Sequence, residues 1–456
     1  MTTAPAHKSG IARFLDQFFQ IAASGSTIRT ELIAGLTTFL AASYVIIVNP
    51  NIIANAGIPF SAGVTATVLV SFVSSVAMGF YGKSPILVAP AMGMNALFTY
   101  TIVLGAHIPL PTALGCTFIA ALLFCIMALF NLRSLLVEAI PVALRYGIGC
   151  GIGVFLALLG LVNAKFVVSD PATVVALAPF TAPVLTFLAG CLLTMFFVIR
   201  RVPGALMAGM AITTILAIPI GRWYGDGSAY PPGVPELVNW TGFVALPDFS
   251  FIGQIDILGA FKFAYLPMIF VLLVTNFLEA MSTFMALAEA GNLNGEDGMP
   301  KNMRESMHID ALAALLSAPL GTSPTTAYLE SAAGIAQGGR TGLVAVVCGV
   351  MFIPFLFLSP VLSLVPSIAT APALVMVGVF MVECLGKINW GDMEDAIPAF
   401  LALILIPLGY SITLGIALSF IAFVALKAMN GKARQIPMAM WVATAICALL
   451  VAQLKG

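Results

Sequence analysis

Two long stretches without a charged side chain limit what this chain can fold into. Leu32–Gly82 and Ser84–Leu132 contain no Asp, Glu, Lys or Arg. A helix needs roughly 20 apolar residues to cross a bilayer, and only helices or closed barrels satisfy their own backbone polar groups in hydrocarbon. The apolar runs lack the alternation of a barrel strand, so they predict helices. We therefore expect an all-α polytopic membrane protein that is embedded in the lipid bilayer.

The composition of the whole chain agrees with this class. The sequence is 61% hydrophobic and 8% charged, whereas soluble domains carry about 25% charged residues. Its formal net charge of +0 argues against a nucleic-acid partner. The 7 cysteines lie apart in apolar runs, so we predict no metal site, no disulfide framework and no cofactor. No nucleophile–base constellation is visible, which argues against an enzyme.

The apolar segments divide into two sets of seven. The predicted spans lie near 32–50, 62–81, 85–104, 112–131, 144–162, 182–200 and 203–221, and then near 263–288, 307–319, 322–338, 341–364, 370–386, 396–411 and 412–429. A further apolar stretch, Ile436–Val451, either spans the membrane or lies at its surface. An odd number of spans per half reverses the second half relative to the first, and this is typical of inverted-repeat transporters.

This pattern predicts five regions along the chain. They are a cytoplasmic N-terminal segment (1–31), a first seven-span repeat (32–221), an extracytoplasmic connection (222–262), a second seven-span repeat (263–429) and a C-terminal segment (430–456) that holds the ambiguous apolar helix. Arg13 and Arg29 precede the first span, and Lys427, Lys432 and Arg434 follow the fourteenth. The positive-inside rule places these residues in the cytoplasm, so we expect a multi-pass protein of the cell inner membrane. The acids Glu383, Asp392, Glu394 and Asp395 are expected in a solvated cytoplasmic connection.

The third segment of each half is interrupted. Ser84–Ala96 and Thr322–Gly334 both place proline and small residues ahead of a helix-like run. In transporters built from inverted repeats, such broken segments meet near the midplane and expose backbone groups to the solute. Asn49–Asn51, which contains Pro50, is expected to end the first span and either cap or kink it.

Three polar residues share one face of the eighth predicted span. Asn276, Glu279 and Thr283 are spaced i, i+3, i+7, and apolar residues flank them. One interpretation is a structural hydrogen-bond network between helices. The other interpretation is a helix face that lines a solute cavity. The carboxylate favours this second interpretation, because an ionisable group inside a membrane is costly without a function.

Glu330 carries the same argument in the tenth segment. It follows Pro324 and stands at the start of a helix-forming run, near exposed amides that a ligand can satisfy. Hydroxyl groups around it can repair the proline break, but they do not account for the carboxylate. Asp310, in the ninth span, is either an internal salt-bridge or cap residue or a site residue.

Two acceptor carboxylates suit a nearly neutral solute with several N–H donors. Nucleobases have such edges, and their flat faces can stack on aromatic side chains. Apolar surroundings favour the protonated form of a carboxyl group, so we expect Glu279 to carry the coupled proton and Glu330 to be a co-ligand. The alternatives are another small solute, such as uracil, xanthine or an organic anion, and a facilitator without coupling.

The runs VNPNI (48–52), APAMGMNA (89–96), GTSPTTAYLESAAGI (321–335) and GGRTG (338–342) resemble the nucleobase–ascorbate transporter superfamily, and more narrowly its guanine/hypoxanthine/adenine permease branch. The resemblance covers about the whole chain. It implies fourteen spans in two inverted repeats, a core domain that moves against a gate domain, and proton-coupled uptake of a purine base; a homodimer is one assembly to be tested.

The same resemblance implies roles for individual residues. Glu279 and Glu330 match the base-binding carboxylates of the eighth and tenth segments. Backbone amides at Met92, Gly93 and Met94 and at Leu329 would contact the base. Thr283 takes a position that is polar or ionisable elsewhere in the superfamily. The branch usually has two aspartates where this chain has Asn276 and Glu279, and threonine where it has Pro324, so the pocket has a different shape.

Overall fold

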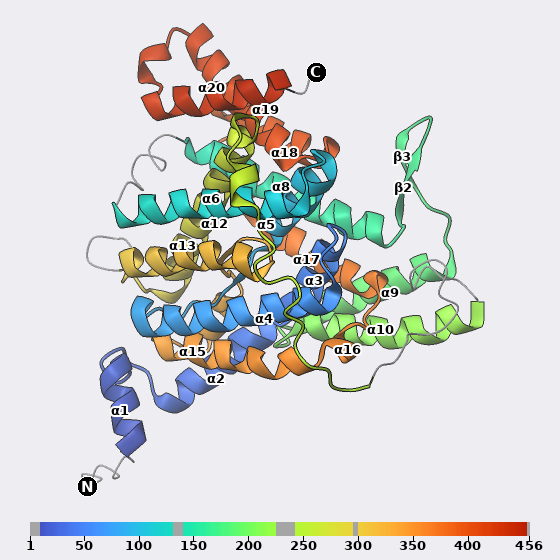
Figure 1. Ribbon diagram of the computed structural model, residues 1–456, viewed down its shortest axis with the longest axis vertical. Coiled ribbons are helices and arrows are strands. Elements are labelled where there is room, and N and C mark those ends of the chain that lie inside the picture. Colours follow the sequence, from blue (N-terminus) through green and yellow to red (C-terminus); the bar gives the residue numbers. More distant parts are fainter. Residues whose placement is uncertain (1–9, 131–139, 225–241, 295–299, 454–456) are drawn as a thin grey trace.

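The computed structural model describes residues 10–130, 140–224, 242–294 and 300–453, and its regular structure is mainly helical (Figure 1). In the first half the elements are α1 (Gly10–Phe19), α2 (Ile28–Ala42), α3 (Val45–Ala54), α4 (Phe60–Ala77), η1 (Met78–Gly82), β1 (Val88–Pro90), α5 (Met92–Ala96), η2 (Leu97–Gly105), α6 (Leu110–Leu129), α8 (Val142–Asn163), β2 (Val167–Asp170), β3 (Val174–Leu177), α9 (Ala182–Ile199) and α10 (Ala205–Tyr224).

The second half of the chain has its own series of elements. Its elements are α11 (Ile257–Ala260), η4 (Phe263–Tyr265), α12 (Leu266–Gly291), α13 (Met303–Leu320), β4 (Thr325–Ala327), α14 (Ser331–Ala336), α15 (Gly342–Phe352), η5 (Ile353–Phe357), α16 (Ser359–Leu362), α17 (Ser367–Val382), η6 (Glu383–Lys387), α18 (Met393–Leu408), α19 (Ile412–Met429), η7 (Ala433–Gln435) and α20 (Met438–Gln453). Residues 225–241 of the predicted extracytoplasmic connection, and parts of both terminal segments, lie outside the described residues.

Within the described residues, 8 helices are long and apolar enough to cross a membrane. They include the stretch Ile28–Ala54, which comprises α2 and α3, and the long helix α12. Four further apolar helices are shorter, among them Met92–Gly105 in the interrupted third segment. The expected polytopic all-α fold is therefore confirmed. The residue boundaries of the five predicted regions stay a prediction.

The two interrupted segments meet each other. Strands β1 and β4 pair antiparallel, with Val88 opposite Ala327 and Pro90 opposite Thr325. Each strand leads within a few residues into a short helix, α5 or α14. The pairing satisfies backbone groups that a broken helix leaves open, as membrane depth requires. Serine hydroxyls complete it, since Ser331 Oγ accepts a hydrogen bond from Leu87 N (3.0 Å).

The helices pack in two groups, and each group draws elements from both halves. In the core group, α2, α3, α4 and α6 pack with α12, α13, α14 and α15. In the gate group, α8 packs against α17 and α18, α9 packs against α10 and α17, and α18 packs against α19. This is the core and gate division that the family resemblance implies. The helix α20 packs on α19 and α12, at the top of Figure 1.

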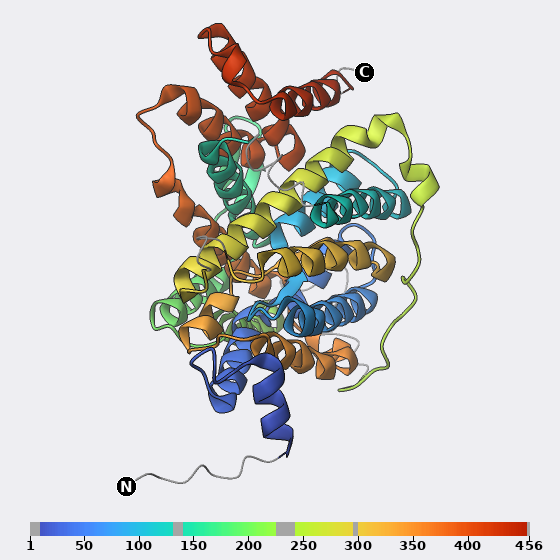
Figure 2. The same cartoon turned by 90° about the vertical axis from the view of Figure 1, so that its left-hand side faces the viewer.

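Helix α12 has a central place in the core group. Figure 2 shows it as the long yellow helix that runs obliquely across the molecule. It contacts α6 and α13 on its flanks and β4, α14 and α5 of the interrupted segments. Residues on its inner face are therefore placed against both broken segments.

The expected end of the first span at Asn49–Asn51 is wrong. The helical stretch breaks earlier, where α2 ends at Ala42 and α3 begins at Val45, and α3 then continues through Pro50 to Ala54. Proline has no backbone N–H to donate, and its ring clashes with the preceding turn of a helix. Pro50 lies inside α3, and Ile46, the residue four positions before it, is also in α3, so this helix accommodates the proline instead of ending at it.

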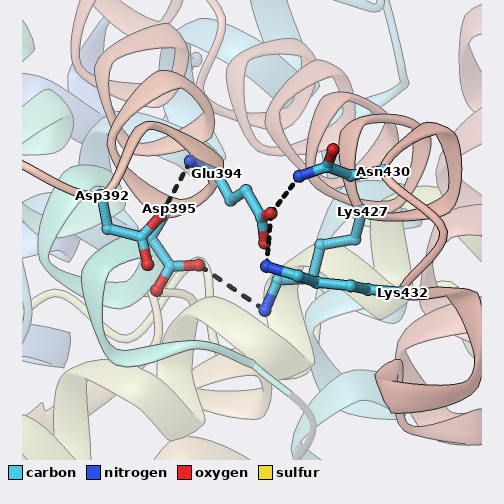
Figure 3. Close-up of polar contacts among 6 residues, drawn as sticks. All are labelled: Asp392, Glu394, Asp395, Lys427, Asn430 and Lys432. Carbon is cyan, nitrogen blue, oxygen red and sulfur yellow. Dashed lines mark hydrogen bonds and ion pairs between the residues drawn. The ribbon is translucent and has the colours of Figure 1, made fainter.

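Charged residues gather where α18 begins and α19 ends (Figure 3). Glu394 accepts hydrogen bonds from Lys432 Nζ (2.6 Å) and from the amide of Asn430. Asp395 lies 3.8 Å from Lys427 Nζ. Acids at a helix N-terminus and lysines at a C-terminus each complement the helix dipole. These acids are thus paired with lysines rather than only solvated, as expected for groups on the same side of the membrane.

Candidate functional site

The polar stripe of α12 is buried. Asn276 and Thr283 are buried and Glu279 is partly buried. Asn276 Oδ1 and Glu279 Oε2 are buried atoms without a hydrogen-bond partner among the described residues. A buried acceptor left unpaired costs about 1–3 kcal/mol, and more if it is charged. A ligand, a proton or water can satisfy such atoms, and the role of the stripe in binding a solute stays a prediction.

Glu279 faces the start of the third-segment helix. A Cβ atom placed on Gly93 would lie 3.6 Å from Glu279 Oε2 and 3.7 Å from its Oε1. Gly93 is the second residue of α5, where backbone N–H groups have no helical partner. The same Cβ would lie only 2.9 Å from Ile152 Cγ2 of α8. Glycine therefore lets the carboxylate, the helix N-terminus and the gate group come together.

Met92 and Met94, which flank Gly93 in α5, contribute through packing. The side chains of Met92 and Met94 are buried and belong to the main hydrophobic core. They fix the first turn of α5 through packing. A contact between a solute and their backbone, as the family resemblance implies, stays a prediction.

Glu330 takes the position that its sequence context predicts. It is the N-cap residue of α14, directly after Leu329, whose side chain is 41% exposed. Its Oε1 accepts a hydrogen bond of 2.6 Å from the hydroxyl of Tyr44. Glu330 stands at the start of α14, which packs against α12, the helix of Glu279. The structure thus places the two carboxylates on neighbouring elements.

Tyr44 is absent from the residues that the sequence indicates. It is 1% exposed and lies at the break between α2 and α3. The sequence does contain one signal for Tyr44, because a tyrosine inside a long uncharged span needs a partner for its hydroxyl. The sequence does not say which partner, since Glu330 is 286 positions away.

Asp310 supports the loop that carries Glu330. It is fully buried and accepts hydrogen bonds from the backbone N of Ala327 (2.7 Å) and from Thr326 Oγ1 (3.1 Å). These bonds come from β4 and not from a helix end, so Asp310 is not a helix cap, and a role as a site residue stays a prediction. Asp310 therefore positions the strand that precedes Glu330.

Asn49 links four segments of the core group. Its Nδ2 donates to Thr67 Oγ1 (2.8 Å) and Thr322 Oγ1 (2.9 Å). Its Oδ1 accepts from Asn95 Nδ2 (2.7 Å) and Ser323 Oγ (3.0 Å). A fully satisfied buried amide fixes one arrangement of its neighbours. Asn49 is thus a cross-link between the first span and both interrupted segments, not the cap that its sequence context suggested.

Comparison with known proteins places this chain in a family. Residues 29–418 match the description "Permease family". The adenine permease AdeP of Escherichia coli is 34% identical over 425 residues, which cover 92% of each chain. The guanine/hypoxanthine permease PbuO of Bacillus subtilis is 38% identical over 424 residues, with 92% of this chain and 96% of the relative covered.

Solved structures show the same fold at low sequence identity. The transmembrane domain of the cyanobacterial bicarbonate transporter BicA has a TM-score of 0.61 at 18% identity, with 87% of this chain and 97% of that chain covered. SLC26A9 has a TM-score of 0.58 at 11% identity, over 93% of this chain and 72% of that one. The family match, the full-length relatives and this shared fold agree: the chain is a multi-pass permease of the nucleobase–ascorbate transporter superfamily and belongs to its guanine/hypoxanthine/adenine branch.

Proposed function

We propose that this permease takes up a purine nucleobase, such as hypoxanthine, guanine or adenine, together with a proton. The observation that carries the proposal is the unpartnered Glu279 Oε2, which lies beside Gly93 where the core group meets the gate helix α8. The relatives named for adenine and for guanine/hypoxanthine support the choice of solute.

The chemistry of the site favours a solute with N–H donors. Asn276 Oδ1 and Glu279 Oε2 are acceptors without partners, and Glu330 adds a second carboxylate on a neighbouring element. A nearly neutral base can donate to all three without a charge conflict. An anion such as bicarbonate would meet like charges at the two glutamates, which is unfavourable. The similarity to BicA therefore supports the fold and does not support bicarbonate as the solute.

In the proposed mechanism the core group moves against the gate group. Glu279 and Glu330 both belong to core elements, whereas Ile152 belongs to α8 of the gate. The base and a proton bind together while the site opens outward, and both leave after the core has moved. Glu279 carries the proton because its free oxygen can hold one, and Glu330 remains an acceptor for base N–H groups. The repeats 32–221 and 263–429 supply this motion in the inner membrane.

An uptake assay in a bacterial strain that lacks purine transport tests the proposal. Labelled hypoxanthine should accumulate above equilibrium, and unlabelled guanine or adenine should compete. A protonophore should abolish the accumulation, whereas removing sodium should not. Stronger competition by uracil, xanthine or an organic anion would favour another solute. Uptake that ignores the protonophore and never exceeds equilibrium would favour a facilitator.

A further inference from the structure

Tyr44 lies outside the two broken segments and α12, yet it donates a hydrogen bond to a carboxylate of the candidate site. Among the described residues it is the one such side chain. Its hydroxyl lies 2.6 Å from Glu330 Oε1, and its ring is 1% exposed. It is held at the junction of α2 and α3, where Ser43 Oγ donates to Leu40 O (2.9 Å). A ring packed this tightly at a helix break has little freedom to leave the carboxylate.

This bond has two consequences for Glu330. A glutamate side chain has several rotatable bonds, and ordering such a side chain on binding costs about 0.5–1.5 kcal/mol. The tyrosine orders Glu330 before a solute arrives. It also fixes the direction in which the carboxylate faces, because Oε1 keeps the hydroxyl of Tyr44 as a donor.

We propose that Tyr44 is a positioning residue for solute binding, which orders the carboxylate of Glu330 before the solute arrives. This inference rests on the proposed function, because it concerns the base that Glu330 receives. It adds a residue of the first span to a site otherwise built from the third, eighth and tenth segments. The solute class it implies presents N–H donors to Glu330, Glu279 and Asn276.

A double-mutant cycle on purified protein in detergent tests the proposal. The variants are Tyr44→Phe, Glu330→Ala and both together, and the readout is the equilibrium Kd for hypoxanthine. Tyr44→Phe removes one oxygen atom and should weaken binding roughly two- to twelve-fold, the ordering cost converted at 1.4 kcal/mol per factor of ten. In the Glu330→Ala background the same substitution should change Kd less than two-fold, since nothing remains to be positioned.

A second readout separates positioning from a structural role. In uptake assays Tyr44→Phe should raise KM by the same factor without lowering the maximal rate. Tyr100→Phe is the matched control: the hydroxyl of Tyr100 accepts a hydrogen bond from Asn55 Nδ2 (3.2 Å), and no hydrogen bond joins it to either glutamate among the described residues. It should leave KM unchanged. If Tyr44→Phe does not fold, Tyr44→Met keeps the apolar volume without a donor and enters the same cycle.

The outcomes are distinct. If the wild-type protein binds none of the purine bases, the proposed function is wrong and the inference about Tyr44 is wrong with it. If the wild type binds but Tyr44→Phe binds equally well, or the effects of the two substitutions simply add, the role of Tyr44 alone is wrong. A loss of maximal rate and of thermal stability at unchanged KM would also overturn it, because that is the result expected of a purely structural tyrosine.

Discussion

The carboxylate of Glu279 lies against Gly93, and Gly93 in turn lies against Ile152 of the gate helix α8. A Cβ at Gly93 would be 3.6 Å from Glu279 Oε2 and 2.9 Å from Ile152 Cγ2. The first distance is ordinary contact, whereas the second is too short for two carbon atoms. The core and the gate therefore approach at a place where only glycine fits without a shift.

Gly93→Ala should impair transport because the added methyl group pushes α5 away from α8. We expect uptake to fall at least about ten-fold, since closing the site depends on sub-ångström positions. Ile152→Ala in the same protein removes the conflicting atom and should restore part of the uptake. Gly149→Ala on α8 is the control, because its Cβ would meet only Cys384 Sγ at 4.0 Å. Normal uptake by Gly93→Ala would contradict this close approach.

The two glutamates should respond differently to neutralisation. Glu330→Gln replaces an acceptor oxygen with a donor, so binding of the base should weaken by about 1.5–3 kcal/mol, as for a hydrogen bond to a charged group. Glu279→Gln should spare some binding or exchange but abolish uphill accumulation, because an amide carries no proton. Equilibrium binding and proton-driven uptake of both variants decide this. Continued accumulation by Glu279→Gln, or normal binding by Glu330→Gln, would show that the roles are assigned wrongly.

The Glu394–Lys432 pair should make stability depend on pH. Hydrogen bonds from Lys432 and Asn430 lower the pKa of Glu394, and Glu394 raises the pKa of Lys432. The contribution of Glu394 is present above its ordinary pKa of about 4.3 and is lost as pH falls through its lowered value. The contribution of Lys432 is present below about 10.4 and is lost as pH rises through its raised value.

The measurement is thermal unfolding of the wild type and of Glu394→Gln from about pH 3 to about pH 11. This range includes the ordinary pKa values of both glutamate and lysine. The wild type should be slightly more stable between about pH 5 and pH 10, and the difference should shrink at both ends. The pair lies at the surface, with the side chain of Lys432 43% exposed and that of Glu394 17% exposed, so the difference should be small and should decrease with added salt. A difference that is constant across the range would exclude this linkage.

Cys150 and Cys384 should form a disulfide readily. Their Sγ atoms lie 3.0 Å apart, although all 7 cysteines are free thiols. In a variant that keeps only these two cysteines, excess oxidised glutathione should produce an intramolecular disulfide, which mass spectrometry of the peptides detects. Variants with one of the two cysteines replaced by serine are the controls. Failure to cross-link would show that α8 and η6 are farther apart in the membrane.

The orientation is tested at Lys432. A cysteine placed there by Lys432→Cys, in a background without native cysteines, should resist a membrane-impermeant thiol reagent in intact cells. It should react once the membrane is permeabilised, which controls for burial. Ready labelling of intact cells would place this end of the protein outside and overturn the proposed cytoplasmic N-terminus.

Some of this architecture follows from the sequence because a bilayer tolerates few charges. The uncharged stretch Leu32–Gly82 needs no tertiary information to be read as membrane helix, and Glu279 and Glu330 stand out because a carboxylate in hydrocarbon is costly. Pro324 and Pro90 lie in the broken segments, but proline alone does not predict a break, since Pro50 lies inside α3. These inferences depend on local rules that act within a few turns of helix.

The partners of the buried polar groups were decided only by the tertiary structure. Tyr44 meets Glu330 across 286 positions, and Asn49 reaches Thr322 across 273. The sequence indicates that each of these groups needs a partner, because an unpaired buried polar atom is costly. It does not identify the partner, since many hydroxyl and amide groups in the spans satisfy the same need. The choice depends on how the two inverted halves pack, which brings residues from distant segments to within hydrogen-bonding distance.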